Sequence, residues 1–353
     1  MTPYLDTLKI LLPAFIAFTV GIFITPYLSH MFYKHKMWKK NSRSNTETTS
    51  NEIFHSIHNE KEETSTPRVG GMIIWLSVFI TTALLFVFSL VSPSELASKF
   101  QFISRGQTLI PLALFFGMSF VGLFDDLLQI RGKGKYANDA LSYRYLKIGT
   151  VCVVGLLVGW WFFSKLNFVS ISVPFDGVLH LGILIIPFVA LVMLATFSTS
   201  IIDGIDGLAG GVLSTSFASF AVIAFFNNQI DIAALCMLIS GALLAFLWFN
   251  IPPARFWMGE TGMLPLTLTL AVIAFLTDSV LLLPLIALPL TLTSASGIIQ
   301  MISKKFFKKK VFLVAPLHHH FQALGWSREK ITMRYWVFSV ASSMLGTIIA
   351  LIS

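Results

Sequence analysis

The sequence has few charged residues and almost no cysteine. Charged residues make up 12% of the 353 positions, hydrophobic residues make up 55%, and the mean hydropathy is +0.78. A soluble globular domain carries about 25% charged residues, so this deficit favours a chain whose outer surface faces lipid. The two cysteines, Cys152 and Cys236, lie inside apolar stretches, which excludes a disulfide framework and a cysteine-based metal site. No internal or inverted repeat of the transporter kind is evident.

Ten apolar stretches are long enough to cross a bilayer, which requires about 20 residues of helix. Their approximate limits are 7–28, 70–92, 108–124, 146–163, 181–200, 208–226, 230–249, 262–279, 280–302 and 334–352. We therefore predict an all-α, polytopic membrane helical bundle of about ten transmembrane helices, forming one integral-membrane domain over residues 1–353. The first stretch has no small-residue cleavage site after it and is predicted to be a retained anchor.

The basic residues predict the orientation of this bundle. With ten spans, the segments after the odd-numbered spans share one side, and that side holds all but four of the 25 lysines and arginines. The exceptions are Lys9, Lys99, Arg105 and Lys165. Positive charge is retained in the cytoplasm, so both termini are expected on the extracytoplasmic side. The polar segment 34–68 is expected to be a flexible cytoplasmic loop.

Five carboxylates are expected at the cytoplasmic ends of spans, where ionisable groups are costly and therefore suggest function. Asp125 and Asp126 end the third span, Asp203 and Asp206 follow the fifth, and Glu260 precedes the eighth. Adjacent carboxylates repel each other unless a cation or a donor compensates, and Mg²⁺ takes one or two carboxylates together with substrate phosphates. A solvated helix cap and a simple Asp-Gly turn are the alternatives for these two motifs.

Two further segments add polar and aromatic groups to the same side. Residues 249–262 include Asn250 and Trp257, an amide and a ring that could bind the edge and the face of a flat base. His318, His319 and His320 lack the spacing of a zinc site, so hydrogen bonding to phosphate or base is the better interpretation. The neighbouring lysines of residues 304–310 are interpreted as a topology signal attracted to anionic lipid. Together these groups suit phosphoryl transfer to a lipid phosphate.

In the same order along the whole chain, these motifs resemble the phospho-N-acetylmuramoyl-pentapeptide transferases. This family belongs to the polyprenyl-phosphate N-acetylhexosamine-1-phosphate transferase superfamily. Residues 66–71 are similar to its Thr-Pro-Thr-Met-Gly-Gly, residues 124–126 to its aspartate pair, and residues 203–208 to its Asp-Gly-x-Asp-Gly-Leu. The stretch from Lys310 through the histidines to Trp336 resembles the segment that distinguishes the muramoyl-pentapeptide branch.

The resemblance implies a bacterial inner-membrane enzyme with its active site at the cytoplasmic face. Its donor would be UDP-N-acetylmuramoyl-pentapeptide, its acceptor undecaprenyl phosphate, its products lipid I and UMP, and its cofactor Mg²⁺. Membrane lipid is a further expected partner, a homodimer is left open, and no nucleic-acid partner is expected. The implied catalytic residues are Asp125, Asp126, Asp203 and His320. The implied metal ligands are Glu260, Asp126 and Asp203. The implied substrate-binding residues are Asp206, Asn250, Trp257, Arg68, Lys147, His318 and His319.

Several positions depart from the family pattern. Glu260 replaces the metal-ligating aspartate, and Gln129 replaces a lysine after the aspartate pair. The lysine expected at the place of Leu146 is displaced to Lys147, and Ser200, Met263 and Gln322 also differ. Three alternatives follow: a UDP-N-acetylglucosamine donor with the same chemistry, an impaired lipid-phosphate-binding paralogue, and a transporter. A two-step reaction through an aspartyl-phosphate also stays open.

Overall fold

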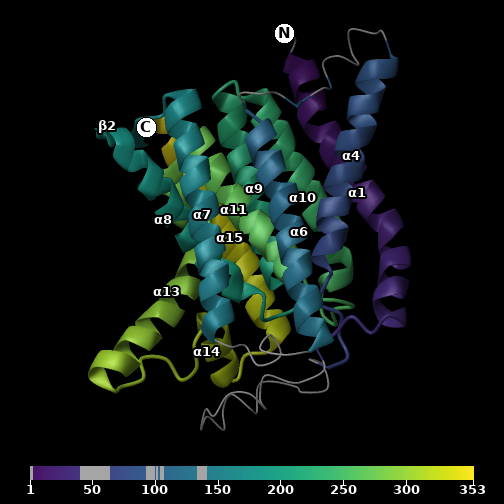
Figure 1. Ribbon diagram of the computed structural model, residues 1–353, viewed down its shortest axis with the longest axis vertical. Coiled ribbons are helices and arrows are strands. Elements are labelled where there is room, and N and C mark those ends of the chain that lie inside the picture. Colours follow the sequence, from purple (N-terminus) through teal and green to yellow (C-terminus); the bar gives the residue numbers. More distant parts are fainter. Residues whose placement is uncertain (1–2, 40–63, 93–99, 101, 104–106, 133–140) are drawn as a thin grey trace.

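The chain folds as a bundle of long helices, with both ends of the chain at the same end of the bundle (Figure 1). The computed structural model describes residues 3–39, 64–92, 100, 102–103, 107–132 and 141–353. Most of the predicted flexible loop, residues 40–63, lies outside the described residues. From the N-terminus, the first eight long helices are α1 (Pro3–Lys34), α4 (Gly71–Val91), α6 (Leu109–Arg131), α7 (Leu141–Leu166), α8 (Ile185–Ser198), α9 (Leu208–Phe226), α10 (Ile230–Asn250) and α11 (Glu260–Leu276).

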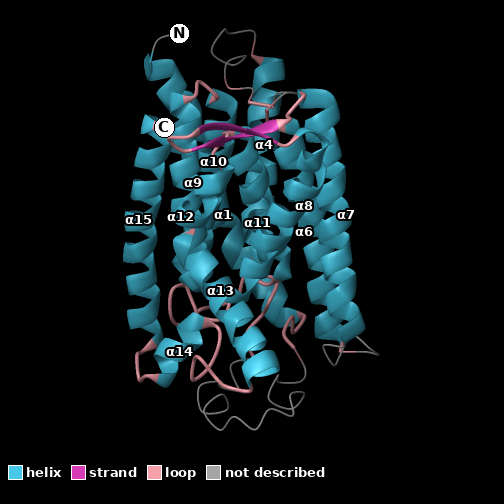
Figure 2. Ribbon diagram, turned by 90° about the vertical axis from the view of Figure 1, so that its left-hand side faces the viewer, coloured by secondary structure: helices cyan, strands magenta, loops and turns pink. Residues whose placement is uncertain are grey.

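The remaining elements follow α11 or connect the long helices. They are β1 (Ser170–Val173), β2 (Gly177–His180), η3 (Gly182–Leu184), η4 (Thr199–Ile202), η5 (Val280–Leu282), α12 (Leu283–Ile286), α13 (Leu288–Ile302), η6 (Ser303–Phe307), α14 (Leu317–Ala323) and α15 (Arg328–Ile352). The two strands form an antiparallel hairpin with Ser170 opposite His180. This hairpin was not predicted; it crosses the end of the bundle remote from α14 (Figure 2).

All ten predicted spans are helical, which confirms the all-α membrane bundle. Among the described residues, eight helices are long and apolar enough to cross a membrane. A ninth span would be broken, because the helical segments on either side of Ala287 are bent by 87°. The eighth predicted span, α11, has 17 residues, about 25 Å at 1.5 Å per residue, and is shorter than the usual span. The protein is therefore a multi-pass membrane protein.

The centre of the bundle is formed by α9, α10 and α11, whose side chains are buried on nearly every side. A helix enclosed by other helices is apolar all round, which explains why these segments show no polar face. Helix α10 packs between α1 and α9, and α11 packs against α6. Phe275 near the end of α11 makes edge contacts with Phe168 and Phe188. This packing fixes the ends of α6, α10 and α11, where the candidate site is built.

Candidate active site

The segment between α10 and α11 forms the backbone of the site. Its residues 256–259 lie beside residues 67–71, which precede and begin α4. The amide of Trp257 donates to the carbonyl of Pro67 at 2.8 Å. The amides of Gly70 and Gly71 donate to the carbonyls of Trp257 and Met258, at 2.9 Å each. A Cβ on Gly71 would lie 2.2 Å from the amide nitrogen of Gly262, so glycine is required for this approach. Two motifs nearly 190 residues apart in the sequence thus form one support.

Gly259 lies where three segments meet. Its φ of +68° is in the left-handed region, and a Cβ there would lie 1.9 Å from the carbonyl of Arg68 and 2.6 Å from Oδ2 of Asp126. Its amide donates to Oδ2 of Asp203 at 3.0 Å. Glycine alone satisfies both the backbone angle and the available space, so the segment before α4, helix α6 and the 203–208 loop can approach one another here.

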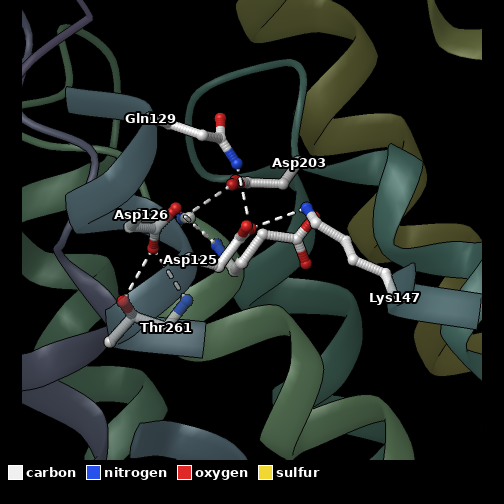
Figure 3. Close-up of polar contacts among 8 residues, drawn as sticks. Asp125, Asp126, Gln129, Lys147, Asp203 and Thr261 are labelled. Atoms are coloured by element: carbon white, nitrogen blue, oxygen red, sulfur yellow. Dashed lines mark hydrogen bonds and ion pairs between the residues drawn. The ribbon is translucent and has the colours of Figure 1, made fainter. Parts of the chain in front are cut away.

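Asp126 anchors the start of α11. Its Oδ1 accepts the amide of Glu260 at 3.2 Å, and its Oδ2 accepts the amide and the hydroxyl of Thr261 at 2.8 and 2.7 Å. A carboxylate at a helix N-terminus satisfies amides that have no partner within the helix. Both oxygens of this buried carboxylate are therefore engaged by protein donors (Figure 3).

Asp125, the neighbour in sequence, faces a different environment. Lys147 on α7 extends its ammonium between two carboxylates, 2.6 Å from Oδ2 of Asp125 and 2.9 Å from Oε1 of Glu260. Gln129, one turn along α6, donates to the same Oδ2 at 2.9 Å. Figure 3 shows Lys147 and Gln129 converging on Asp125. The second oxygens, Oδ1 of Asp125 and Oε2 of Glu260, are buried without a hydrogen-bond partner among the described residues.

Asp206 and Asn250 hold the polar loop in shape. The carboxylate of Asp206 accepts the amide of Ala254 and the indole N–H of Trp257, each at 3.0 Å. Asn250 is 4% exposed, accepts the amide of Gly207 at 2.9 Å and donates to the carbonyl of Phe256 at 2.8 Å. The structure thus places Asn250 within the scaffold rather than on the surface of the site. The Trp257 ring remains partly exposed beneath the guanidinium of Arg68, 5.8 Å from its centroid.

The three histidines do not point the same way. The rings of His318 and His319 lie against Gly204, where a Cβ would be 2.9 and 3.2 Å from their Nε2 atoms. His319 is hydrogen-bonded through Nδ1 to Gln322 at 2.6 Å. His320 instead accepts the amide of Leu313 at 3.2 Å and packs against Phe312. The first two therefore border the 203–206 loop, whereas the third supports the segment before α14.

The chain that forms this site is similar to known proteins over nearly its whole length. Residues 108–278 match the Glycosyl transferase family 4. The phospho-N-acetylmuramoyl-pentapeptide-transferase of Clostridium perfringens strain 13 is 32% identical over 94% of this chain and 96% of its own length. The proteins of the same name from Caldanaerobacter subterraneus and Chloroflexus aggregans are 30% and 29% identical over 94% and 98% of this chain.

The chain belongs to the phospho-N-acetylmuramoyl-pentapeptide-transferase family.

Membership of this family gives the departures a structural meaning. Lys147, displaced by one position from the family pattern, reaches both Asp125 and Glu260. Gln129 keeps a donor on Asp125 where the pattern has a lysine. Glu260 is one methylene longer than the expected aspartate, yet its carboxylate lies within the same cluster. The order of motifs could not show these contacts, because they depend on how α6, α7 and α11 are rotated.

Proposed function

We propose that this protein transfers phospho-N-acetylmuramoyl-pentapeptide from its UDP donor to undecaprenyl phosphate, giving lipid I and UMP in peptidoglycan synthesis. The observation that carries the proposal is the cluster of Asp125, Glu260 and Lys147 in a chain that is similar to these transferases over nearly its whole length. Two carboxylates, an ammonium and open buried oxygens are the groups that bind and neutralise phosphates with a divalent cation.

The carboxylates of the cluster fit Mg²⁺. The described residues contain no group of three His, Cys, Asp or Glu side chains arranged to hold a metal. A Mg²⁺ ion, however, needs only one or two carboxylates when substrate phosphates and water complete its shell. Glu260 and Asp125 each keep one buried oxygen that no described residue binds. Glu260 and Asp125 would therefore hold Mg²⁺, which neutralises phosphate charge when bound.

Asp126 and Asp203 are better suited to positioning. Asp126 accepts three donors from residues 260–261, and one oxygen of Asp203 accepts the amide of Gly259. A direct metal bond from Asp126 would compete with these donors. We therefore assign to both residues the task of holding the Gly259–Thr261 segment against the cluster, in place of metal ligation.

The transfer proceeds by direct displacement in this proposal. An oxygen of undecaprenyl phosphate attacks the β-phosphorus of the UDP-linked donor and forms a new phosphorus–oxygen bond. The bond from the β-phosphorus to the bridging oxygen breaks, and its electron pair leaves with UMP. Asp125 positions the acceptor phosphate through the cation that it would share with Glu260, and Lys147 offsets the charge that develops on the phosphates.

The donor nucleotide would bind over Trp257, Arg68, His318 and His319. Trp257 has its indole N–H fixed by Asp206, so its ring face is held in one orientation for stacking on a base. Arg68 lies above this ring and supplies positive charge for the diphosphate. His320 accepts the amide of Leu313 through Nδ1, so its role in this proposal is to position the two histidines that precede it. The enzyme would lie in the bacterial inner membrane, as a monomer or homodimer, with this end of the bundle in the cytoplasm.

The test is UMP release from the purified protein with undecaprenyl phosphate, Mg²⁺ and one donor at a time. We expect turnover with UDP-N-acetylmuramoyl-pentapeptide and not with UDP-N-acetylglucosamine. Turnover with the second donor alone would retain the chemistry and replace the donor. Folded protein that releases no UMP from either donor would disprove the proposal, and omission of Mg²⁺ tests the metal separately.

A further inference from the structure

Helix α13 and the residues after it leave the bundle at the end that carries the site (Figure 1). The bend of 87° at Ala287 turns α13 away from the direction of the preceding helical segment. Residues 304–310 form the far end of this projection and are here named the basic tip. The chain then returns through residues 311–316 to α14, which begins at Leu317.

The basic tip combines charge with aromatic surface. Five of its seven residues are lysines, and all seven side chains are exposed. The other two, Phe306 and Phe307, are each 70% exposed. No acidic residue occurs between Asp278 and Glu329 in the sequence. A topology signal alone would require only the positive charge, so the two exposed phenylalanines need another explanation.

The shape of the basic tip is fixed by hydrogen bonds at its base. The side-chain Nε2 of Gln300 donates to the carbonyl of Phe312 at 3.0 Å. Its side-chain Oε1 accepts the backbone amides of Val311 and Phe312 at 3.0 Å each. The hydroxyl of Ser303, a buried residue, donates to the carbonyl of Lys309 at 2.9 Å. The outgoing helix and the returning chain are thus joined, and the lysines and phenylalanines are presented together.

We propose that the basic tip is a binding surface for the anionic headgroups of membrane phospholipids. The apolar side chains on α13 that lead to it, Ile298, Ile299 and Ile302, are exposed and continue the lipid-facing surface of the bundle. Phe306 and Phe307 insert at the level of the headgroups, and the lysines extend to the phosphates above them. Clusters of four to eight basic residues beside a membrane helix bind anionic lipid in this way.

The same segment connects the membrane surface with the candidate site. Phe312, held by Gln300, packs against His320 with ring centroids 5.5 Å apart. Ser296 on α13 accepts the amide of Leu317, the first residue of α14, at 2.8 Å. Lipid bound at the basic tip therefore lies on an element that directly supports the histidine segment. This surface is independent of the proposed transfer reaction and can be tested without it.

The experiment measures which lipids stay on the intact protein. The full chain is placed in nanodiscs of equal phosphatidylglycerol and phosphatidylcholine, released into mild detergent, and its retained lipids are counted by native mass spectrometry. We expect phosphatidylglycerol to be enriched over phosphatidylcholine. Changing Lys304, Lys305, Lys308, Lys309 and Lys310 together to Gln should lower this enrichment by at least about fivefold, which is the contribution of a single lysine near the surface.

Two matched variants separate the basic tip from general basicity. K308Q/K309Q removes two exposed lysines from the tip, and K34Q/K36Q removes two exposed lysines at and just after the last residue of α1, at the same end of the bundle. Only the first should lower the enrichment. F306S/F307S should reduce the total lipid retained while phosphatidylglycerol stays preferred. Unfolding temperatures close to that of the unchanged protein establish that each variant is folded.

Three results would overturn the proposal. The first is unchanged enrichment in the five-lysine variant, which leaves the lysines as a topology signal only. The second is an equal loss from K34Q/K36Q. The third is displacement of the retained lipid by millimolar inorganic phosphate, which identifies a pocket for free phosphate. UMP release by the unchanged protein is measured separately, so failure of the lipid surface and failure of the transferase proposal are distinguishable.

Discussion

Asp278 at one end of the bundle and the pair Asp125 and Glu260 at the other end have opposite environments. Asp278, remote from the site and exposed, accepts the amide and the hydroxyl of Ser172 and clasps the β-hairpin. Asp125 and Glu260 each keep one buried oxygen that no group in the described part of the chain binds. An unsatisfied buried acceptor costs about 1–3 kcal/mol, whereas an exposed one can bind water. Both oxygens of Asp278 are satisfied by Ser172. The open oxygens of Asp125 and Glu260, which lie beside the shared ammonium of Lys147, indicate a place for a ligand.

The sharpest test of this comparison removes the charge that faces the open oxygens. D125N and E260Q should each lower UMP release by about 1,000-fold or more, because the phosphates and the cation lose a ligand in the transition state. The measurement is the single-turnover rate at saturating donor. Near-normal turnover in either variant would disprove the site assignment.

Lys147 should have the next largest effect. K147Q leaves Asp125 and Glu260 without their shared cation and should lower kcat/KM by about 100-fold. The matched control is K165Q, which changes an exposed lysine at the other end of the same helix and should leave activity unchanged. Equal activity in the two variants would mean that the ammonium contributes nothing at the site.

Two glycines with positive φ allow the same comparison for stability. Gly259 has φ +68°, and a Cβ added there would meet atoms at 1.9 and 2.6 Å, whereas Gly177 in the hairpin has φ +84° and open space. G177A adds backbone strain of about 1 kcal/mol, and G259A adds steric overlap to it and should cost about 3 kcal/mol or more. Thermal unfolding in detergent measures the difference, and equal shifts would contradict the close packing around Gly259.

The clasp at Asp278 should matter for stability and not for activity. D278A removes both hydrogen bonds to Ser172 and should lower the free energy of unfolding by about 1–2 kcal/mol. UMP release should change by less than about twofold, because the hairpin lies at the opposite end of the bundle from the site. A large loss of activity in a folded D278A protein would show that the two ends are coupled.

The smallest effect is expected at Gln129. Q129K introduces the lysine of the family pattern beside Asp125 and should lower the KM for the donor by about two- to fivefold through its added charge. The unfolding temperature should be nearly unchanged, since this position is only partly buried. A higher KM would show that the second ammonium competes with Lys147 for Asp125.

The sequence allowed the spans to be placed, because the length of each apolar run can be counted directly and compared with the thickness of a bilayer. The bend at Ala287 was not predicted, because residues 280–302 form one apolar run, although Pro289 in the first turn of α13 is a local signal for a new helix start. The β-hairpin was also missed, since its strands have only four residues each. The hairpin is held by a distant residue, Asp278, and such a contact leaves little trace in a local pattern.

The sequence predicted which residue types gather at the candidate site, and it could not distinguish the environments in which the structure places them. Asp125 and Asp126 are indistinguishable in the sequence, yet one faces Lys147 and the other accepts the amides of α11. Asn250 has the chemistry of a ligand-binding residue, but its side-chain oxygen accepts the amide of Gly207 and its side-chain nitrogen donates to the carbonyl of Phe256. His318 and His320, two positions apart, point to different neighbours. These differences arise from the rotation of helices and loops, which residue identity does not specify.

The ion pairs of Lys147 also fix the rotation of α7 relative to α6 and α11. A shift of α7 by one residue would rotate its side chains by about 100° and carry the ammonium away from both carboxylates. Those partly buried carboxylates would then be left without their counter-charge, which destabilises the shifted arrangement. Correct ionic pairing at one end of the bundle thus selects the rotational setting of α7 along its whole length, and with it the packing of α7 on α8.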